Sequence, residues 1–171
     1  MFKKLAHYYK LNYWDGVRHA KDMGVRLGKG CSLYSRNFGS EPYLIELGDR
    51  VQVGLDVHFF THGASWMFRE KYPDFDFFGK IKVGNNVYIG YGTIILPGVT
   101  IGSNVLIAAG SVVTKSIPDN VIAGGNPAKP IGNLSDLEDR IMDYNLNCKN
   151  MSRKEKMEFL LSQDDSKFLQ K

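Results

Sequence analysis

A six-residue repeat runs through the middle of the chain and constrains the fold more than any other feature. From residue 83 the sequence reads VGNNVY, IGYGTI, ILPGVT, IGSNVL, IAAGSV and VTKSIP, so every hexad begins with valine or isoleucine. The second place is mostly very small, and the fifth is β-branched in five of the six hexads. The same phase continues upstream in LGDRVQ, VGLDVH and FFTHGA, which begin with Leu47, Val53 and Phe59.

A period of six fits neither ordinary secondary-structure pattern. A helical period would scatter the leading residues around a helix, and strict alternation would not require small residues at the second place. A β-sandwich would need turn signals about every 8–12 residues. The repeat instead predicts short strands joined by tight corners, with three sides closing a coil of about eighteen residues stacked at roughly 4.8 Å. The expected ladders are Val83 over Ile101, Ile89 over Ile107 and Ile95 over Val113.

The ends of the chain lack the repeat. Residues 3–22 are amphipathic and predict a helix that ends near Gly24. The expected domains are an N-terminal helical segment (1–24), a β-helix domain (25–132) with a loop excursion at 64–82, and a C-terminal helical tail (133–171). The terminal elements should cover the open ends of the solenoid core.

Several local deviations are expected within this plan. The hexad LGKGCS, which begins at Leu27, is out of phase by two residues, as a short insertion near 35–44 would produce. Glycine is expected to supply corner conformations, and Pro97–Gly98 marks one corner. After Pro118 the hexads give way to a Pro/Gly-rich exit.

Two C-terminal helices are predicted by capping boxes. Ser135 with Glu138 would begin the first, and Ser152 with Glu155 the second. The apolar residues expected to face inward are Leu137, Ile141 and Met142 in the first helix and Met157, Leu160 and Leu161 in the second.

Composition excludes several function classes. The net charge of +4 is not concentrated in a basic run, so nucleic-acid binding gains little support. The two cysteines, Cys31 and Cys148, are far apart and suit a reducing compartment. The basic N-terminus is not followed by an apolar stretch typical of a secretory signal, and nothing approaches the ~20 apolar residues of a membrane span. We therefore expect a cytoplasmic protein.

The segments NNVYIG, ILPGVTIG, AAGSVVTK, IPDN and AGGNPAKP resemble the hexapeptide-repeat acetyltransferases. FGSEPYLIELGD (38–49), FFTHGASWMFR (59–69) and YPDFDFFGKIKVGNN (72–86) are similar to the branch that acetylates sugars of bacterial capsule and surface polysaccharides. Maltose, galactoside and antibiotic acetyltransferases share the scaffold. The resemblance implies an all-β core folded as a left-handed parallel β-helix. It also implies a homotrimer with active sites between subunits, acetyl-CoA as the donor and a sugar-like acceptor.

Acyl transfer to an alcohol needs a base that titrates near neutrality and fixed donors for the developing oxyanion. His62 matches the family's catalytic histidine and lies where the hexads stop, so it is the expected general base. His58, four residues earlier, need not share its face because the local period is six. No metal site is expected.

For the coenzyme, the positions that match the family are Gly90, Tyr91, Ala109, Gly110, Thr114, Lys115 and Lys129. The Gly90–Tyr91 and Ala109–Gly110 pairs should expose backbone amides, one of them a candidate oxyanion donor. Lys115 and Lys129 could meet the nucleotide phosphates.

The acceptor is expected beside the excursion, which carries six aromatic residues and is longer than a passive connection. Most of these rings should pin the loop to its own or a neighbouring prism, and one or two could face a sugar. The candidate acceptor residues are Asn37, Glu41, Trp66 and Arg69. Arg69 could hold an acidic group of the acceptor.

Other readings stay open at this point. A zinc lyase of the γ-carbonic anhydrase type would need three histidines, and the repeat region offers only His58 and His62. A non-catalytic trimeric scaffold would show the same glycines and aliphatics. An acetyltransferase of another small acceptor, such as an antibiotic, would share the scaffold.

Overall fold

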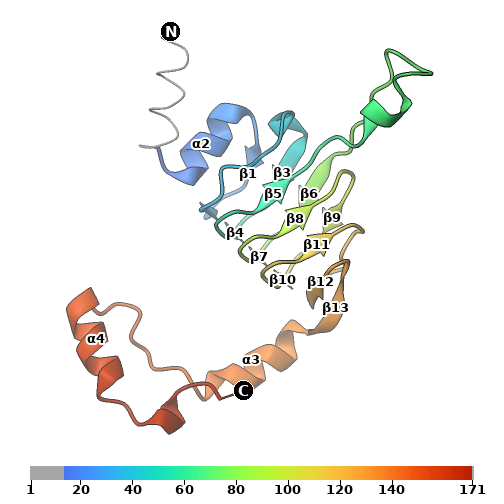
Figure 1. Ribbon diagram of the computed structural model, residues 1–171. Coiled ribbons are helices and arrows are strands. Elements are labelled where there is room, and N and C mark those ends of the chain that lie inside the picture. Colours follow the sequence, from blue (N-terminus) through green and yellow to red (C-terminus); the bar gives the residue numbers. More distant parts are fainter. Residues whose placement is uncertain (1–13, 171) are drawn as a thin grey trace. The chain divides into compact units, whose positions relative to one another are not determined.

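The computed structural model describes residues 14–170 and shows a three-sided parallel β-helix (Figure 1). Sheet A contains β1 (Arg26–Leu27), β3 (Ile45–Leu47), β6 (Ile81–Val83) and β9 (Thr100–Ile101). Sheet B contains β2 (Ser32–Leu33), β4 (Val51–Val53), β7 (Val87–Ile89), β10 (Val105–Ile107), β12 (Val121–Gly125) and β13 (Ala128–Asn133). Sheet C contains β5 (His58–Phe59), β8 (Ile94–Ile95) and β11 (Val112–Val113). The expected left-handed β-helix is confirmed.

The register of the strands follows the hexads. Val83 pairs with Ile101, Ile89 with Ile107 and Ile95 with Val113, so all three predicted ladders are confirmed. The leading aliphatics fill the interior, and those of β7, β8 and β10 are fully buried. Each coil therefore covers the apolar surface of the next, which is the source of the stability of a solenoid.

Two insertions interrupt the coils. Leu27 pairs with Leu47, twenty positions on, which confirms the two-residue offset. Leu47 pairs with Val83, thirty-six positions on, so the excursion adds the length of one whole coil and the phase is preserved. The excursion ends at Lys80, because β6 begins at Ile81; we refer below to residues 64–80 as the excursion.

The small residues at the second hexad place have a different role from the one expected. A Cβ on Gly84 would lie 2.6 Å from Ser103 Oγ and 2.8 Å from the carbonyl carbon of Gly102, so close stacking of coils excludes a side chain there. The left-handed corner conformations fall two places later, as at Asn86 (φ 54°) and Gly98 (φ 82°). The corner at Pro97–Gly98 is confirmed, but glycine is not the general corner residue, because asparagine also tolerates this conformation.

Helix α2 (Gly16–Met23) covers the first coil. Asp15 is extended and its side chain accepts from the amide of Arg18, and Gly24 ends the helix in a left-handed conformation. The expected helix over 3–22 is therefore wrong at residues 14–15, since the N-cap interrupts it; its residues 3–13 lie outside the described part. Ala20 is fully buried, so this end of the core is closed.

The exit after Pro118 is more regular than expected. Strand β12 continues sheet B, and β13 pairs with it in antiparallel register, with Gly125 opposite Ala128. Hairpin pairing explains why the six-residue period stops here although the sheet does not.

Residues from Ser135 onward form a second compact unit. It contains most of α3 (Leu134–Met142), together with α4 (Arg153–Leu161) and a 3₁₀ turn, η3 (Asp165–Lys167). The division falls two residues after the expected one.

Of the two capping boxes expected in this unit, one is confirmed and one is wrong. Ser152 and Glu155 form the predicted capping box. The Ser135 box is wrong, because α3 begins at Leu134 and the Ser135 hydroxyl bonds to Asp136 instead. The expectation of inward-facing residues is largely wrong, since Leu137 and Leu160 are half-buried but the other four are exposed. Over residues 14–170, no helix is both long and apolar enough to cross a membrane.

Candidate active site

His62 lies where the chain leaves the prism. Strand β5 ends at Phe59, and an isolated antiparallel bridge joins His62 to Phe78, so the excursion leaves and returns side by side. The amide of Gly79 donates to the carbonyl of Thr61 at 2.8 Å, which closes the base of the loop. His62 is thus held by backbone contacts although the excursion beyond it has no core of its own.

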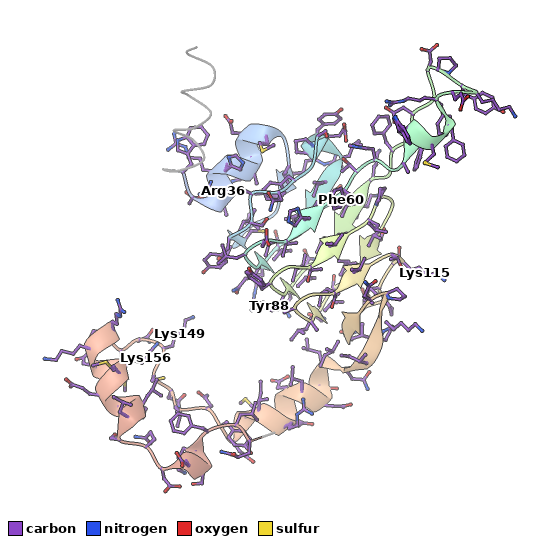
Figure 2. The ribbon with its side chains drawn as sticks, in the orientation of Figure 1. Arg36, Phe60, Tyr88, Lys115, Lys149 and Lys156 are labelled. Atoms are coloured by element: carbon purple, nitrogen blue, oxygen red, sulfur yellow. The ribbon has the colours of Figure 1, made fainter. Side chains whose placement is uncertain are left out.

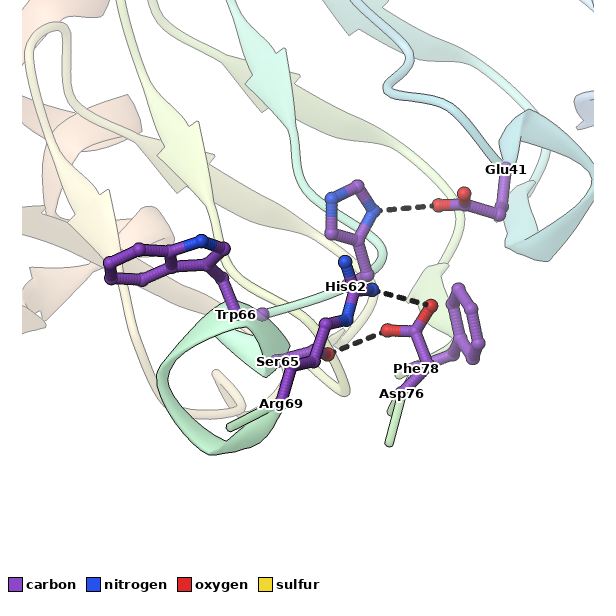
Figure 3. A pocket seen from close by; sticks show the side chains of 8 residues that line it. Glu41, His62, Ser65, Trp66, Arg69, Asp76 and Phe78 are labelled. Carbon is purple, nitrogen blue, oxygen red and sulfur yellow. Dashed lines mark hydrogen bonds and ion pairs between the residues drawn. The ribbon is translucent and has the colours of Figure 1, made fainter. Parts of the chain in front are cut away.

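Glu41 is the partner of the His62 imidazole. Its Oε2 lies 2.9 Å from His62 Nδ1 and also accepts the Thr61 hydroxyl at 2.7 Å (Figure 3). Glu41 stands directly before the 3₁₀ turn η1 (Pro42–Leu44), and its side chain is only 16% exposed. The hydroxyl of Thr61 and then the imidazole of His62 lower the pKa of the Glu41 carboxyl below its usual value.

This contact assigns roles to the two ring nitrogens. An ionised carboxylate can only accept a hydrogen bond, so Nδ1 carries a proton, and in the neutral imidazole Nε2 has the lone pair. Among the described residues nothing engages Nε2, and the side chain is 41% exposed. The ring therefore has its basic nitrogen free.

A cavity of about 200 Å³ adjoins the imidazole. It is lined by Glu41, His62, Gly63, Ser65, Trp66, Arg69, Asp76 and Phe78. Three of the four acceptor candidates, Glu41, Trp66 and Arg69, are thus brought together around His62. Phe78 stands edge-on to the imidazole, with ring centroids 6.3 Å apart, and Trp66 is 78% exposed (Figure 3).

Arg69 lies at the cavity and also contacts its own loop. Its Nε donates to the Phe75 carbonyl at 3.3 Å and its Nη2 lies 3.5 Å from Asp76 Oδ2. The guanidinium therefore makes two long contacts within its own loop, and the nearby Asp76 carboxylate partly offsets its charge. Sequence reasoning missed Asp76, which also accepts the Ser65 hydroxyl at 2.6 Å.

The other aromatic residues of the excursion pack against one another. Phe75 is at the centre, with ring centroids 5.4 Å from Phe68, 6.5 Å from Tyr72 and 5.9 Å from Phe77. All four rings are still at least one-third exposed. The cluster holds the loop together and leaves apolar surface available for a ligand or a neighbouring subunit.

Asn37 does not belong to this cavity. It bridges β5 at His58, whose Nε2 lies 3.1 Å from Asp56 Oδ1 and 3.4 Å from Asn37 Nδ2. Asn37 and His58 line a different cavity, so Asn37 is separated from the other acceptor candidates. Within residues 14–170, no group of three or more histidine, cysteine, aspartate or glutamate side chains is placed to hold a metal ion.

The expected coenzyme residues divide between two edges of the prism. The B–C edge (54–57, 90–93 and 108–111) joins sheets B and C and carries Gly90, Tyr91, Ala109 and Gly110. The C–A edge (60–80, 96–99 and 114–117) joins sheets C and A and carries His62, Thr114 and Lys115. Gly110 and Thr114 flank β11, so the edges are separated by roughly 13 Å at the usual rise per residue.

On the B–C edge the expected amides are only partly free. The amide of Gly90 donates to Ile107 and that of Gly110 donates to Tyr91, both at 2.8 Å, so neither can be an oxyanion donor. The amides of Tyr91 and Ala109 make no hydrogen bond within the described part of the chain. Gly90 has a steric role instead, since a Cβ there would lie 2.5 Å from Ala109 N.

On the C–A edge, β5, β8 and β11 are stacked in order, so Lys115 lies two coils from His62, roughly 10 Å along the axis. Lys115 is exposed (Figure 2). Lys129 is exposed on β13, opposite Gly124 in the final hairpin.

Comparison with known proteins decides the family. Residues 80–115 match the family described as bacterial transferase hexapeptide (six repeats). The chain is 49% identical over 146 residues to Protein CapG of Staphylococcus aureus, and the match covers 83% of this chain and 85% of CapG. The chain belongs to the hexapeptide-repeat acetyltransferases.

Two further relatives of this acetyltransferase are informative. It is 40% identical over 98 residues to galactoside O-acetyltransferase of Escherichia coli, covering 56% of this chain and about half, 47%, of that relative. The solved structure of a galactoside acetyltransferase in complex with coenzyme A superposes with a TM-score of 0.60 at 27% identity, and the match covers 80% of each chain. The family resemblance expected from the sequence is confirmed.

Proposed function

We propose that this acetyltransferase moves the acetyl group of acetyl-CoA to a hydroxyl of a sugar acceptor, with His62 as general base. The observation that carries the proposal is the 2.9 Å contact between His62 Nδ1 and Glu41 Oε2, which leaves Nε2 free beside a cavity. A carboxylate that holds an imidazole in one tautomer is the arrangement that makes histidine an effective base.

The steps follow from the two ring nitrogens. Acetyl-CoA would supply the acetyl group as a thioester. His62 Nε2 would take the proton of the acceptor hydroxyl as its oxygen attacks, and Glu41 would stabilise the resulting imidazolium through Nδ1–H. His62 would then return the proton to the leaving group. Glu41 is thereby a positioning residue rather than the acceptor contact first expected.

The prism edges suit an extended coenzyme. A Cβ on Gly92 or Gly110 would meet nothing within 4 Å, so the B–C edge is open to close approach. The amides of Tyr91 and Ala109 are available donors, and Thr114, Lys115 and Lys129 are exposed. We propose that these residues hold the pantetheine and phosphate groups.

We also propose a homotrimer with the site between neighbouring prisms. The candidate residues lie on two edges of one prism, and packing edge to edge would let the C–A edge of one copy face the B–C edge of the next. This geometry supports an intersubunit site because a coenzyme in one groove could then contact both sets of residues.

The acceptor class rests on the cavity and the relatives. Aromatic rings beside a base suit the apolar face of a pyranose. The galactoside acetyltransferases support a sugar hydroxyl as acceptor, and we propose a surface polysaccharide precursor. Because Cys31 and Cys148 are both free thiols, we place the reaction in the cytoplasm.

The test is a coupled binding and turnover measurement on the full chain. Calorimetry should show acetyl-CoA binding, and mass spectrometry should show one acetyl group added to a sugar from a panel of free and nucleotide-linked hexoses. The trimer is checked by light scattering. Absence of acetyl-CoA binding would favour a non-catalytic scaffold. Acetylation of an antibiotic, with no acetylation of any sugar, would show that the acceptor is not a sugar.

A further inference from the structure

Asp76 is a second carboxylate in the His62 cavity and has no part in the proton transfer proposed above. It comes from the returning arm of the excursion, whereas Glu41 comes from the segment before η1. Its Oδ1 accepts from the Ser65 hydroxyl at 2.6 Å and from the Phe77 amide at 3.0 Å. The carboxylate is thus fixed in position at the cavity wall, with 41% of its side chain exposed.

Asp76 is ionised under ordinary conditions. The Ser65 hydroxyl is the largest cause of a lowered pKa for this carboxyl, and the Phe77 amide and the Arg69 charge act in the same direction. Its field also reaches the catalytic pair, because the charge of Asp76 raises the pKa of Glu41. The carboxylate is therefore a permanent negative charge beside the reacting group.

The fixed charges of the cavity do not cancel. Glu41 and Asp76 contribute two negative charges, and Arg69 contributes one positive charge across a 3.5 Å contact with Asp76. Glu41 Oε2 is occupied by Thr61 and His62, whereas Asp76 Oδ2 has only the long contact with Arg69. Asp76 Oδ2 is therefore a free acceptor at the cavity wall, and a carboxylate there suits a hydroxyl and repels an anion.

We propose that Asp76 is a specificity-determining residue that selects an uncharged, hydroxyl-rich acceptor and rejects acceptors with a carboxylate at the sugar ring. The inference rests on the proposed function and deepens it. Asp76 Oδ2 accepts a hydrogen bond from a second hydroxyl of the acceptor while the first meets His62 Nε2. Phe78 and Trp66 flank the same cavity and face the apolar part of the ring.

The experiment compares matched acceptors. Methyl pyranosides of the gluco and galacto series are each offered as the neutral hexoside and as the uronate, and kcat/KM is measured with acetyl-CoA. The wild-type enzyme should prefer the neutral sugar by at least about 10-fold, the scale of a like-charge contact in a half-exposed site. Asp76→Asn should narrow this preference at least several-fold, because the amide removes the charge and keeps the shape.

Asp74→Asn is the matched control. Asp74 is an exposed carboxylate of the same excursion that does not line the cavity, so its removal should leave the ratio unchanged. Equal rates for neutral and acidic sugars in the wild type would overturn the inference, even if the variant fails to fold, and leave the proposed function standing. The inference would also be overturned if Asp76→Asn and Asp74→Asn reduced the preference for the neutral sugar equally. A wild-type enzyme that acetylates none of these sugars would contradict the proposed function and the inference together.

Discussion

The prism wall and the excursion use apolar residues in opposite ways. Phe59 and Ile81, on either side of the excursion, are essentially inaccessible to solvent. Between residues 60 and 80 no apolar side chain reaches that degree of burial, although the segment is rich in aromatic residues. The wall is held by stacked, buried aliphatics, whereas the excursion is held by a half-exposed aromatic cluster around Phe75 and by polar contacts such as Ser65 with Asp76.

This difference separates the residues that stabilise the fold from the residues that could carry out chemistry. A buried aliphatic ladder contributes free energy wherever it lies, but it offers no donor, acceptor or base. The excursion contributes little buried apolar area, and together with Glu41 it holds the titratable groups of the cavity. Substitutions in the two regions should therefore affect different measurements.

The largest expected effect is on turnover. His62→Ala removes the proposed base and should lower kcat by about 10²–10⁴-fold, the usual contribution of general base catalysis. The melting temperature should stay close to that of the wild type, because His62 is half-exposed. His58→Ala is the control, since His58 lies outside the cavity. A near-normal rate for His62→Ala would remove the assignment.

A core substitution should reverse this pattern. Ile107→Ala leaves a void between β7 and the last coil and should reduce the free energy of unfolding by about 2–5 kcal/mol. Denaturant unfolding measures the loss, and activity per folded molecule should change little. A large loss of kcat in Ile107→Ala with a normal free energy of unfolding would contradict the separation of stability from chemistry.

The close approach of coils gives a smaller effect on stability. Gly84→Ala places a methyl group within 3 Å of the next coil, at Gly102 and Ser103. Relief of this overlap should cost about 1–3 kcal/mol of unfolding free energy. Gly92→Ala tests the other role of glycine, because its Cβ meets open space and only the left-handed conformation is disturbed. Thermal unfolding of both variants distinguishes overlap from backbone strain.

Glu41→Gln should produce the smallest change, and it should affect both turnover and stability. Loss of the carboxylate should lower kcat about 10-fold, because His62 is less well oriented and its imidazolium less stabilised. The lowered pKa of Glu41 means that its contribution to stability is complete above the ordinary value of 4.5 and is lost as the pH falls through the lower folded value. The difference in Tm between wild type and variant should therefore shrink in acid.

The repeat made the wall predictable because its signal is local and periodic. A residue every sixth place had to be aliphatic, and its partner had to lie eighteen places on, so Val83 and Ile101 could be paired without a structure. The same reasoning failed at the ends. Ser135 was misread as a cap because a capping pattern is short, and the β12–β13 hairpin was missed because it abandons the period that identified the other strands.

The cavity was less predictable than the wall. His62 was found through a family motif, but Glu41 lies twenty-one residues away and its contact with Nδ1 depends on how the coils stack. Asn37 was grouped with the other acceptor candidates, although the fold turns it toward His58. Asp76 has no sequence signal, because a carboxylate in a polar loop is ordinarily a solvated charge.

By itself, the sequence determined the three-sided coil, its register and the place where it is interrupted, since burial of the first and fifth residues of successive hexads admits few other solutions. Only the tertiary structure decided which polar side chains meet. Contacts such as Glu41 with His62 and Asp76 with Ser65 join residues from separate turns of the chain. Their geometry follows from stacking and loop closure, which leave no period in the sequence.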